Sequence, residues 1–407
     1  AAGNGALNIN AKQDITVSAA ISAATGQLAT TLSSDSDVSG GGAILVNTSG
    51  SIASNGGAII LGGGLAGAGY AEGNGANIVG ASIAGNINGG GGSVTVRGKG
   101  ASAVGGNNTG VVVNSGATLQ TSGTGVISID GIGGAAGPTN VGVAIDNATV
   151  TQSGSGAINI TGTGGASGTF NNIGVSISDF GGAGRVTSTG TGDINITGIG
   201  GAGTTGQGTG VRVIGSTTGG AVRSVTGAIT ITGTGAGVGD GAVVGVSGFT
   251  LADVSSTGAA PINIVGTGAG AGSVGVRVFG GTVGGATATG NLLLNSLLGT
   301  GIALTDATVQ TTGNVTLNAK GGGAVEQGGA GSIKAAALRL LSDTAGTVVT
   351  LNNVSNDVTT IAGNVKGSVG YTDAIGINVG AVTSFDGTGI STSTGLTTTG
   401  ALTLTTV

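Results

Sequence analysis

The sequence predicts an all-β protein: a right-handed parallel β-helix (β-solenoid) with three short strands per coil and a central repeat of about 33 residues. Glycine accounts for 95 of the 407 residues, Tyr and Phe together number seven, and Cys, His, Met and Trp are absent. Short segments alternate apolar with polar residues, which is typical of half-buried strands. These segments recur at a nearly constant spacing, and none has helical periodicity.

The first strand of the repeat carries two apolar residues separated by one polar residue and is bounded by glycine. Successive copies lie 33, 31, 36, 35 and 33 residues apart. The apolar pairs are Val94 and Val96, Ile127 and Ile129, Ile158 and Ile160, Ile194 and Ile196, Ile229 and Ile231, and Ile262 and Ile264.

Two further strands are expected in each coil. The second opens with glycine, and its copies begin at Gly110, Gly142, Gly174, Gly210, Gly275 and Gly301, with a degenerate copy at Gly245. The third precedes the next copy of the first strand, and its copies begin at Ala117, Ala148, Arg185 and Ala307. Each segment ends in Gly, Asn, Asp or Ser, which marks turns.

A stack of such coils accounts for the composition. Strands in register form three parallel sheets around a core so thin that it accepts Val, Ile, Leu and Ala but few aromatic rings. Glycine-rich stretches at 131–138, 162–168, 198–208 and 266–272 predict variable loops at one corner. Stacked small polar side chains can hydrogen-bond along the axis, and the predicted outward column contains Thr95, Ser128, Asn159, Asn195, Thr230, Asn263 and Thr316.

We expect one continuous solenoid with three zones. Residues 1–90 form short irregular coils, residues 91–312 carry the 33-residue repeats, and residues 313–407 return to shorter coils. No proline-rich or charged linker separates them. The chain has neither an initiator Met nor a recognisable signal sequence, so we expect it to be a piece of something longer.

Charge and residue types argue against several functions. The net charge is −5 and the eleven basic residues do not cluster, so no nucleic acid is expected as a partner. The uncharged stretch from Lys99 to Asp130 is interrupted by polar residues and is not a transmembrane helix. Without His or Cys the chain lacks the usual general base and thiol nucleophile, so we expect no enzymatic activity and no cofactor.

The chain resembles the shaft of filamentous-haemagglutinin-like exoproteins of bacterial two-partner secretion systems. The resemblance lies in Gly5-Ala-Leu-Asn-Ile-Asn-Ala, Asp14-Ile-Thr-Val and Ser54-Asn-Gly-Gly-Ala-Ile-Ile-Leu, and later in Leu338-Arg-Leu-Leu-Ser and the run from Asn352 to Val365. It implies a secreted or cell-surface protein of a diderm bacterium, exported through an outer-membrane secretion pore. It further implies adhesion to a host or neighbouring-cell surface or its glycans. The family's amino-terminal secretion motif has no match here.

Four side chains are candidates for surface contacts. Asp146 and Asp179, like Asp306, follow the second strand at similar places; turn formation is the favoured interpretation, because Asp bonds its own backbone at strand ends. Arg212 and Arg277 lie in one outward column two repeats apart, where they face solvent or meet an anionic glycan. Asp35-Ser-Asp-Val-Ser-Gly resembles the start of a calcium loop, but Val46 stands at the twelfth position, so no metal site is expected.

Three functions remain open. The first is a rigid spacer that holds a binding tip away from the cell and adds weak, distributed adhesion. The second is a self-assembling extracellular fibre or sheath, in which solenoids associate through open strand edges. The third is a polysaccharide-active β-helix enzyme, which would need clustered carboxylates with aromatic flanks.

Overall fold

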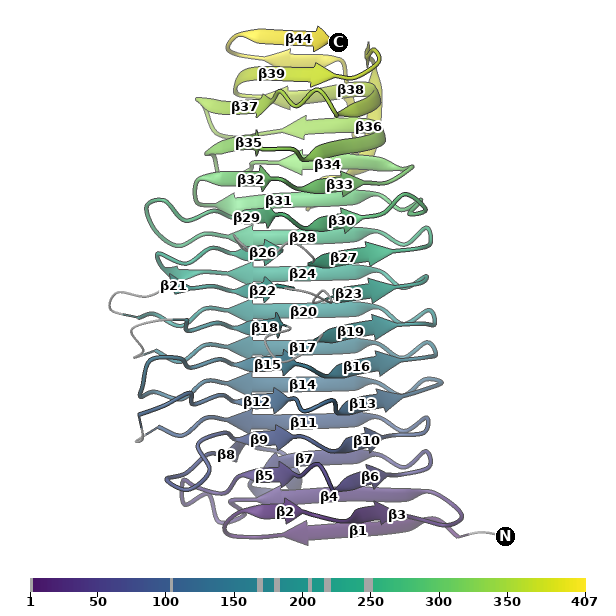
Figure 1. Cartoon of the computed structure of the whole chain (residues 1–407), viewed down its shortest axis with the longest axis vertical. Coiled ribbons are helices and arrows are strands. Elements are labelled where there is room, and N and C mark those ends of the chain that lie inside the picture. Colours follow the sequence, from purple (N-terminus) through teal and green to yellow (C-terminus); the bar gives the residue numbers. More distant parts are fainter. Residues whose placement is uncertain are drawn as a thin grey trace.

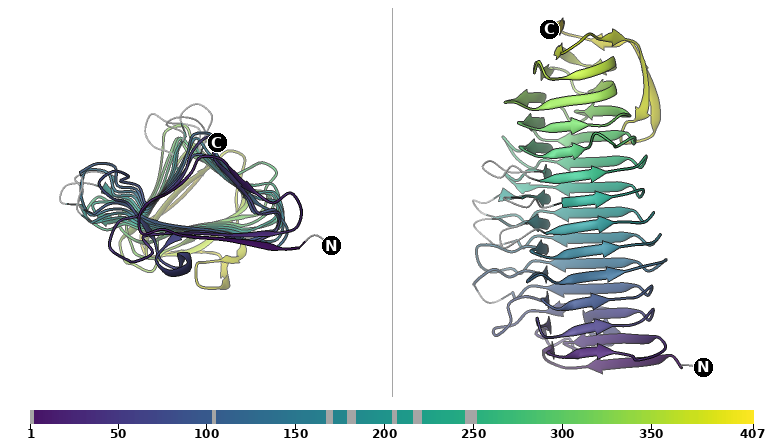
Figure 2. Two further views of the ribbon diagram at one scale, coloured as in Figure 1. Left: turned by 90° about the horizontal axis from the view of Figure 1, so that it is seen from below. Right: turned by 45° about the vertical axis from the view of Figure 1, so that its right-hand side comes forward.

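The computed structural model describes residues 3–102, 105–166, 171–178, 184–203, 207–215, 221–244 and 252–407. In these ranges the chain forms a right-handed parallel β-helix, which confirms the predicted fold class (Figure 1). Viewed along its axis the helix has a triangular cross-section, and loops project from its corners (Figure 2). None of the described helical segments is long and apolar enough to cross a lipid bilayer.

Each coil passes through three faces, which we call face 1, face 2 and face 3 in chain order. Face 1 contains β1 (Gly5–Asn10), β4 (Leu28–Ser34), β7 (Ile59–Gly63), β8 (Ala71–Glu72), β11 (Val94–Lys99), β14 (Ile127–Ile132), β17 (Ile158–Thr163), β20 (Ile194–Ile199), β24 (Ile229–Thr234), β28 (Ile262–Thr267), β31 (Leu292–Leu298), β34 (Asn314–Asn318), β40 (Asn378–Val379) and β43 (Leu396–Thr398).

Face 2 is a parallel sheet of 14 described strands. They are β2 (Ile15–Val17), β5 (Ile44–Val46), β9 (Ala81–Ile83), β12 (Val111–Val113), β15 (Val143–Asp146), β18 (Val175–Ser178), β22 (Val211–Val213), β26 (Ala242–Val244), β29 (Val276–Phe279), β32 (Gly301–Thr305), β35 (Ala324–Gly328), β37 (Thr347–Leu351), β39 (Gly367–Asp373) and β44 (Leu402–Thr406). At about 4.8 Å between strands, this sheet is on the order of 60 Å long.

Face 3 contains β3 (Ala20–Ser22), β6 (Ser51–Ala53), β10 (Asn86–Asn88), β13 (Thr118–Thr121), β16 (Thr149–Gln152), β19 (Arg185–Ser188), β23 (Ala221–Ser224), β27 (Asp253–Ser256), β30 (Thr282–Gly284) and β33 (Thr308–Gln310). Two long strands, β36 (Ser332–Leu341) and β38 (Asp357–Val365), run through the corner from face 3 into face 1. The remaining elements are a 3₁₀ turn, η1 (Leu65–Gly67), an antiparallel pair, β21 (Gln207–Gly208) with β25 (Ala236–Gly237), and a hairpin, β41 (Ala381–Phe385) with β42 (Ile390–Thr394).

The register of the strands matches the repeat seen in the sequence. Ile127, Ile158, Ile194, Ile229 and Ile262 stack on one another in face 1, and the second and third segment types stack in faces 2 and 3. The degenerate copy at Gly245 lies outside the described residues. A continuous apolar cluster runs from Ile15 to Tyr371, so one narrow core supports the whole stack.

The outward column of face 1 is also confirmed. Thr95, Ser128, Asn159, Asn195, Thr230 and Asn263 pair in register, and Asn195 Nδ2 donates to Asn159 Oδ1 over 3.0 Å. Between Asn263 and Thr316, however, the column contains Leu293, which is 2% exposed. An apolar outward residue can be buried there only because another part of the chain covers it.

Buried polar side chains close the corner between face 3 and face 1. Thr121 Oγ1 donates to the Gly92 carbonyl over 2.6 Å, Ser188 Oγ to the Gly192 carbonyl over 2.6 Å, and Thr311 Oγ1 to the Gly290 carbonyl over 2.6 Å. Gln152 Nε2 donates to the Gly125 carbonyl over 3.1 Å. These bonds satisfy turn carbonyls that would otherwise be buried without a partner.

Candidate functional site

The candidate arginines lie on the outer side of face 2. Arg212 on β22 pairs with Val243 on β26, which in turn pairs with Arg277 on β29. The two arginines therefore share one column and lie two coils apart, as the sequence predicts. Val243 between them is buried, so the column does not form a continuous basic strip.

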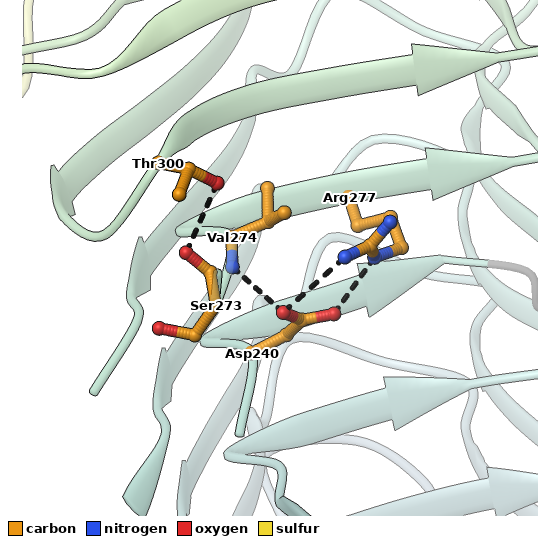
Figure 3. A network of polar contacts seen from close by, with 5 residues as sticks. All are labelled: Asp240, Ser273, Val274, Arg277 and Thr300. Atoms are coloured by element: carbon orange, nitrogen blue, oxygen red, sulfur yellow. Dashed lines mark hydrogen bonds and ion pairs between the residues drawn. The ribbon is translucent and has the colours of Figure 1, made fainter. Parts of the chain in front are cut away.

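Arg277 is held by an acidic partner from the preceding coil (Figure 3). Its Nε lies 2.7 Å from Asp240 Oδ2, and its Nη2 lies 3.5 Å from Asp240 Oδ1. The same carboxylate accepts a hydrogen bond from the Val274 backbone N–H over 2.7 Å. Asp240 thus fixes both the guanidinium and the segment that enters β29, and the charge of Arg277 is neutralised locally.

Arg212 is partly buried, whereas its place in the outward column predicts a side chain in solvent. Its outward neighbours Ser176 and Val243 are 4% and 6% exposed, so this part of face 2 is covered. Burial lowers the pKa of Arg212 to about 10. Its Nε is buried and has no hydrogen-bond acceptor among the described residues. A partly buried guanidinium of this kind is not placed for ready contact with a large anionic polymer.

The aspartates lie at turns. Asp306 has a φ of 50°, which fits the turn interpretation, but its Oδ1 accepts a hydrogen bond over 2.8 Å from the backbone N–H of Ala330 in the next coil and not from its own turn. Asp146 ends β15, and its Oδ1 lies 3.4 Å from the Oγ of Ser178 in the next coil. Asp179 lies outside the described residues.

The segment that resembles the start of a calcium loop is also a turn. Asp35 has a φ of 43°, and its Oδ1 accepts hydrogen bonds from the Ser39 and Gly40 backbone N–H groups over 2.9 and 3.2 Å. Asp37 Oδ2 lies 3.6 Å from Lys12 Nζ. Within the described ranges, no three His, Cys, Asp or Glu side chains are grouped as a metal site would require.

Sequence reasoning missed two polar arrangements. Asp240 was not singled out, although an acidic residue one repeat before Arg277 is a signal for a cross-coil ion pair. The second arrangement involves Arg339 on β36, which is 4% exposed and bonded to the distant β41–β42 hairpin. No local pattern around Arg339 reveals that partner, because more than forty residues separate them.

Comparison with protein-family models, curated protein sequences and solved structures finds no match for this chain. The described geometry is therefore the structural basis for assigning a function. It defines a continuous β-solenoid whose polar surface groups largely serve turns and cross-coil contacts.

Proposed function

We propose that this chain is a rigid shaft segment of a large secreted or cell-surface bacterial adhesin. It acts as a spacer that holds a binding tip away from the cell, and its surface adds weak, distributed adhesion. The observation that carries the proposal is the unbroken apolar cluster from Ile15 to Tyr371, because a rod with one core resists bending between its coils.

The polar surface chemistry also supports a structural role. Arg277 and Asp240 bind each other, and Asp306 and Asp35 bond to backbone N–H groups. These side chains are used to hold coils and turns. The resemblance to filamentous-haemagglutinin-like shafts supports the cell-surface setting and export through an outer-membrane pore.

Changing the number of coils tests the spacer role. Deletion of residues 127–228 removes three whole coils, because Ile127 and Ile229 occupy the same position in register. We expect a folded rod about 14 Å shorter by small-angle scattering and electron microscopy. Duplication of the same residues lengthens the rod by the same amount.

The same pair of variants is then expressed on the surface of the bacterium that carries the gene. Attachment to target cells falls for the short rod and is kept by the long one if reach is the function. Equal attachment by both variants contradicts the spacer role. Ordered polymers of the purified chain with a fixed repeat favour the self-assembling fibre instead.

A further inference from the structure

The β41–β42 hairpin leaves the stack and lies over the outer side of face 1 (Figure 2). It is inserted between β40 and β43, which both pair with β38, and its two ends meet where the Gly395 N–H donates to the Gly380 carbonyl over 2.6 Å. The hairpin therefore interrupts the face 1 strand of the last coil. It crosses the strands of the earlier coils rather than extending a sheet.

Polar bonds hold the hairpin against face 1. Arg339 Nη1 donates to the Ser384 carbonyl over 3.1 Å, and its Nη2 and Nε donate to the hydroxyls of Ser391 and Ser393 over 2.8 and 2.9 Å. Thr316 Oγ1 lies 2.7 Å from Ser384 Oγ, and Asn318 Nδ2 donates to the Asp386 carbonyl over 2.7 Å. Arg339 is thus a positioning residue for everything that the hairpin carries.

A cleft of about 240 Å³ lies between the hairpin and face 1. Phe385 and Ile390 line it from the hairpin, and Leu293, Pro261, Asn263 and Asn291 line it from the coils below. Phe385 is one of only seven aromatic residues in the chain. Asn291 is oriented because its Oδ1 accepts a hydrogen bond from the Asn314 backbone N–H over 3.0 Å.

The lining of this cleft selects the chemistry of its ligand. None of the described residues that line it is charged, whereas a second cleft beside the hairpin is lined by Lys320, Asp343 and Asp386. An aromatic ring and aliphatic side chains beside two amides suit a ligand with an apolar face and a rim of hydroxyl groups, because each amide both donates and accepts. A sugar ring has this distribution of groups, whereas a purely apolar ligand would form no hydrogen bond with either amide.

We propose that the cleft beneath the β41–β42 hairpin binds a ring of a neutral saccharide, with Phe385 and the exposed Ile390 against its apolar face and Asn263 and Asn291 bonded to its hydroxyls. This inference rests on the proposed adhesive function and gives it a location. The sequence alone argues against a sugar platform because aromatic residues are so few. The fold places one of them beside the polar column of face 1.

Binding is measured with the complete chain and three neutral disaccharides: cellobiose, lactose and N,N′-diacetylchitobiose. We expect saturation-transfer NMR and calorimetry to detect at least one of them. Asn263→Ala, which lies on β28 and leaves the hairpin unchanged, weakens that binding by about tenfold, equivalent to about 1.4 kcal/mol. Phe385→Leu, which keeps an apolar side chain and so preserves the fold, weakens it by a similar factor.

Asn159→Ala is the matched control. Asn159 lies in the same outward column three coils away from Asn263, so this variant keeps the affinity of the parent chain. Absence of binding to all three disaccharides overturns the proposal, as does unchanged binding by both Asn263→Ala and Phe385→Leu. Equal binding of galacturonic acid disaccharide contradicts the choice of a neutral ligand. The effect of coil number on rod length and attachment is a separate readout, so the shaft proposal can survive failure of this one.

Discussion

The coils from β11 to β30 and those from β31 to β39 share one core but differ at the corner between face 1 and face 2. In the first region register partners in face 1 lie 31 to 36 residues apart, as from Ile127 to Ile158 and from Ile158 to Ile194. In the second they lie 23 residues apart, as from Val315 to Leu338 and from Leu338 to Ile361. We call them the loop-bearing coils and the compact coils.

The corner column changes between these two regions. In the loop-bearing coils it consists of glycines: Gly98, Gly131, Gly162, Gly198, Gly233 and Gly266. In the compact coils Ser296 pairs with Gly266, and Ala319 and Ser342 follow the paired residues Asn318 and Leu341. A β-helix corner therefore does not require glycine as such.

The loop at the corner between face 1 and face 2 creates the requirement for glycine. A Cβ at Gly131 would lie 2.1 Å from the carbonyl oxygen of Gly142, and one at Gly162 would lie 2.1 Å from that of Gly174. Gly142 and Gly174 are where the chain returns from the loop to begin face 2. The returning backbone passes so close to the departing strand that only a residue without a side chain fits.

The largest effect is expected from the shared core. Ile160→Ala in a loop-bearing coil and Leu340→Ala in a compact coil each remove a side chain that is at most 1% exposed. We expect each to lower the free energy of unfolding by about 2–5 kcal/mol. Chemical denaturation measures both, and a loss in one region alone would show that the two regions do not share a cooperative core.

Arg339→Ala tests how the compact coils hold their hairpin. The loss of hydrogen bonds from a buried cation should lower the local opening free energy of residues 381–394 by about 1.5–3 kcal/mol. Hydrogen exchange should report the change at the hairpin and not at β17 or β20. Unchanged exchange in the hairpin would mean that Arg339 does not secure it.

Substitutions at the corner glycines test the difference between the loop-bearing and the compact coils directly. Gly162→Ala should cost about 1–3 kcal/mol, because its Cβ meets a backbone carbonyl. Gly105→Ala is the control, since a Cβ there has no heavy atom within 4 Å, and should change stability by less than about 0.5 kcal/mol. In the compact coils Ser342→Ala adds no steric clash, so its cost of about 1 kcal/mol should come from losing the hydrogen bond that the hydroxyl accepts from the Lys366 backbone N–H. Equal losses of stability in Gly162→Ala and Gly105→Ala would refute the steric explanation.

Acid should loosen the hairpin before the loop-bearing coils. Burial raises the pKa of Asp386, but hydrogen bonds from Ser391 and Thr388 outweigh it and hold the pKa well below its usual range. A carboxylate with a lowered pKa stabilises the fold above its unfolded value, near 4, and loses that contribution as the pH falls further. The protection of the hairpin amides against hydrogen exchange, corrected for the intrinsic rate at each pH, should therefore fall below about pH 4 in the parent chain. Asp386→Asn should remove this pH dependence.

The smallest effect is expected on face 2. Arg277→Ala removes an ion pair whose arginine side chain is 34% exposed, so the loss should be about 0.2–1 kcal/mol and should shrink in high salt. Asp240→Ala should cost more, because its carboxylate also accepts the Val274 N–H. Equal effects of the two substitutions would show that the backbone bond contributes nothing.

The sequence by itself determined the coil. Alternation such as Ile158-Asn-Ile160 specifies both a strand and the side that faces the core, and its recurrence about every 33 residues places equivalent strands in register. The turn at Asp306 was likewise predictable, because Asp tolerates the left-handed backbone conformation that ends the strand there. These features depend on neighbouring residues only.

Only the tertiary structure decided which surface groups meet. Asp240 reaches Arg277 because the chain returns to the same face one coil later, and the length of the corner loop sets that return. The segment Ile390-Ser-Thr-Ser-Thr alternates like any other strand of this protein, yet it lies outside the stack, where Arg339 binds it. The outer faces have no repeating hydrophobic pattern to specify a partner, so long-range geometry alone brings Phe385 and Leu293 to the same cleft.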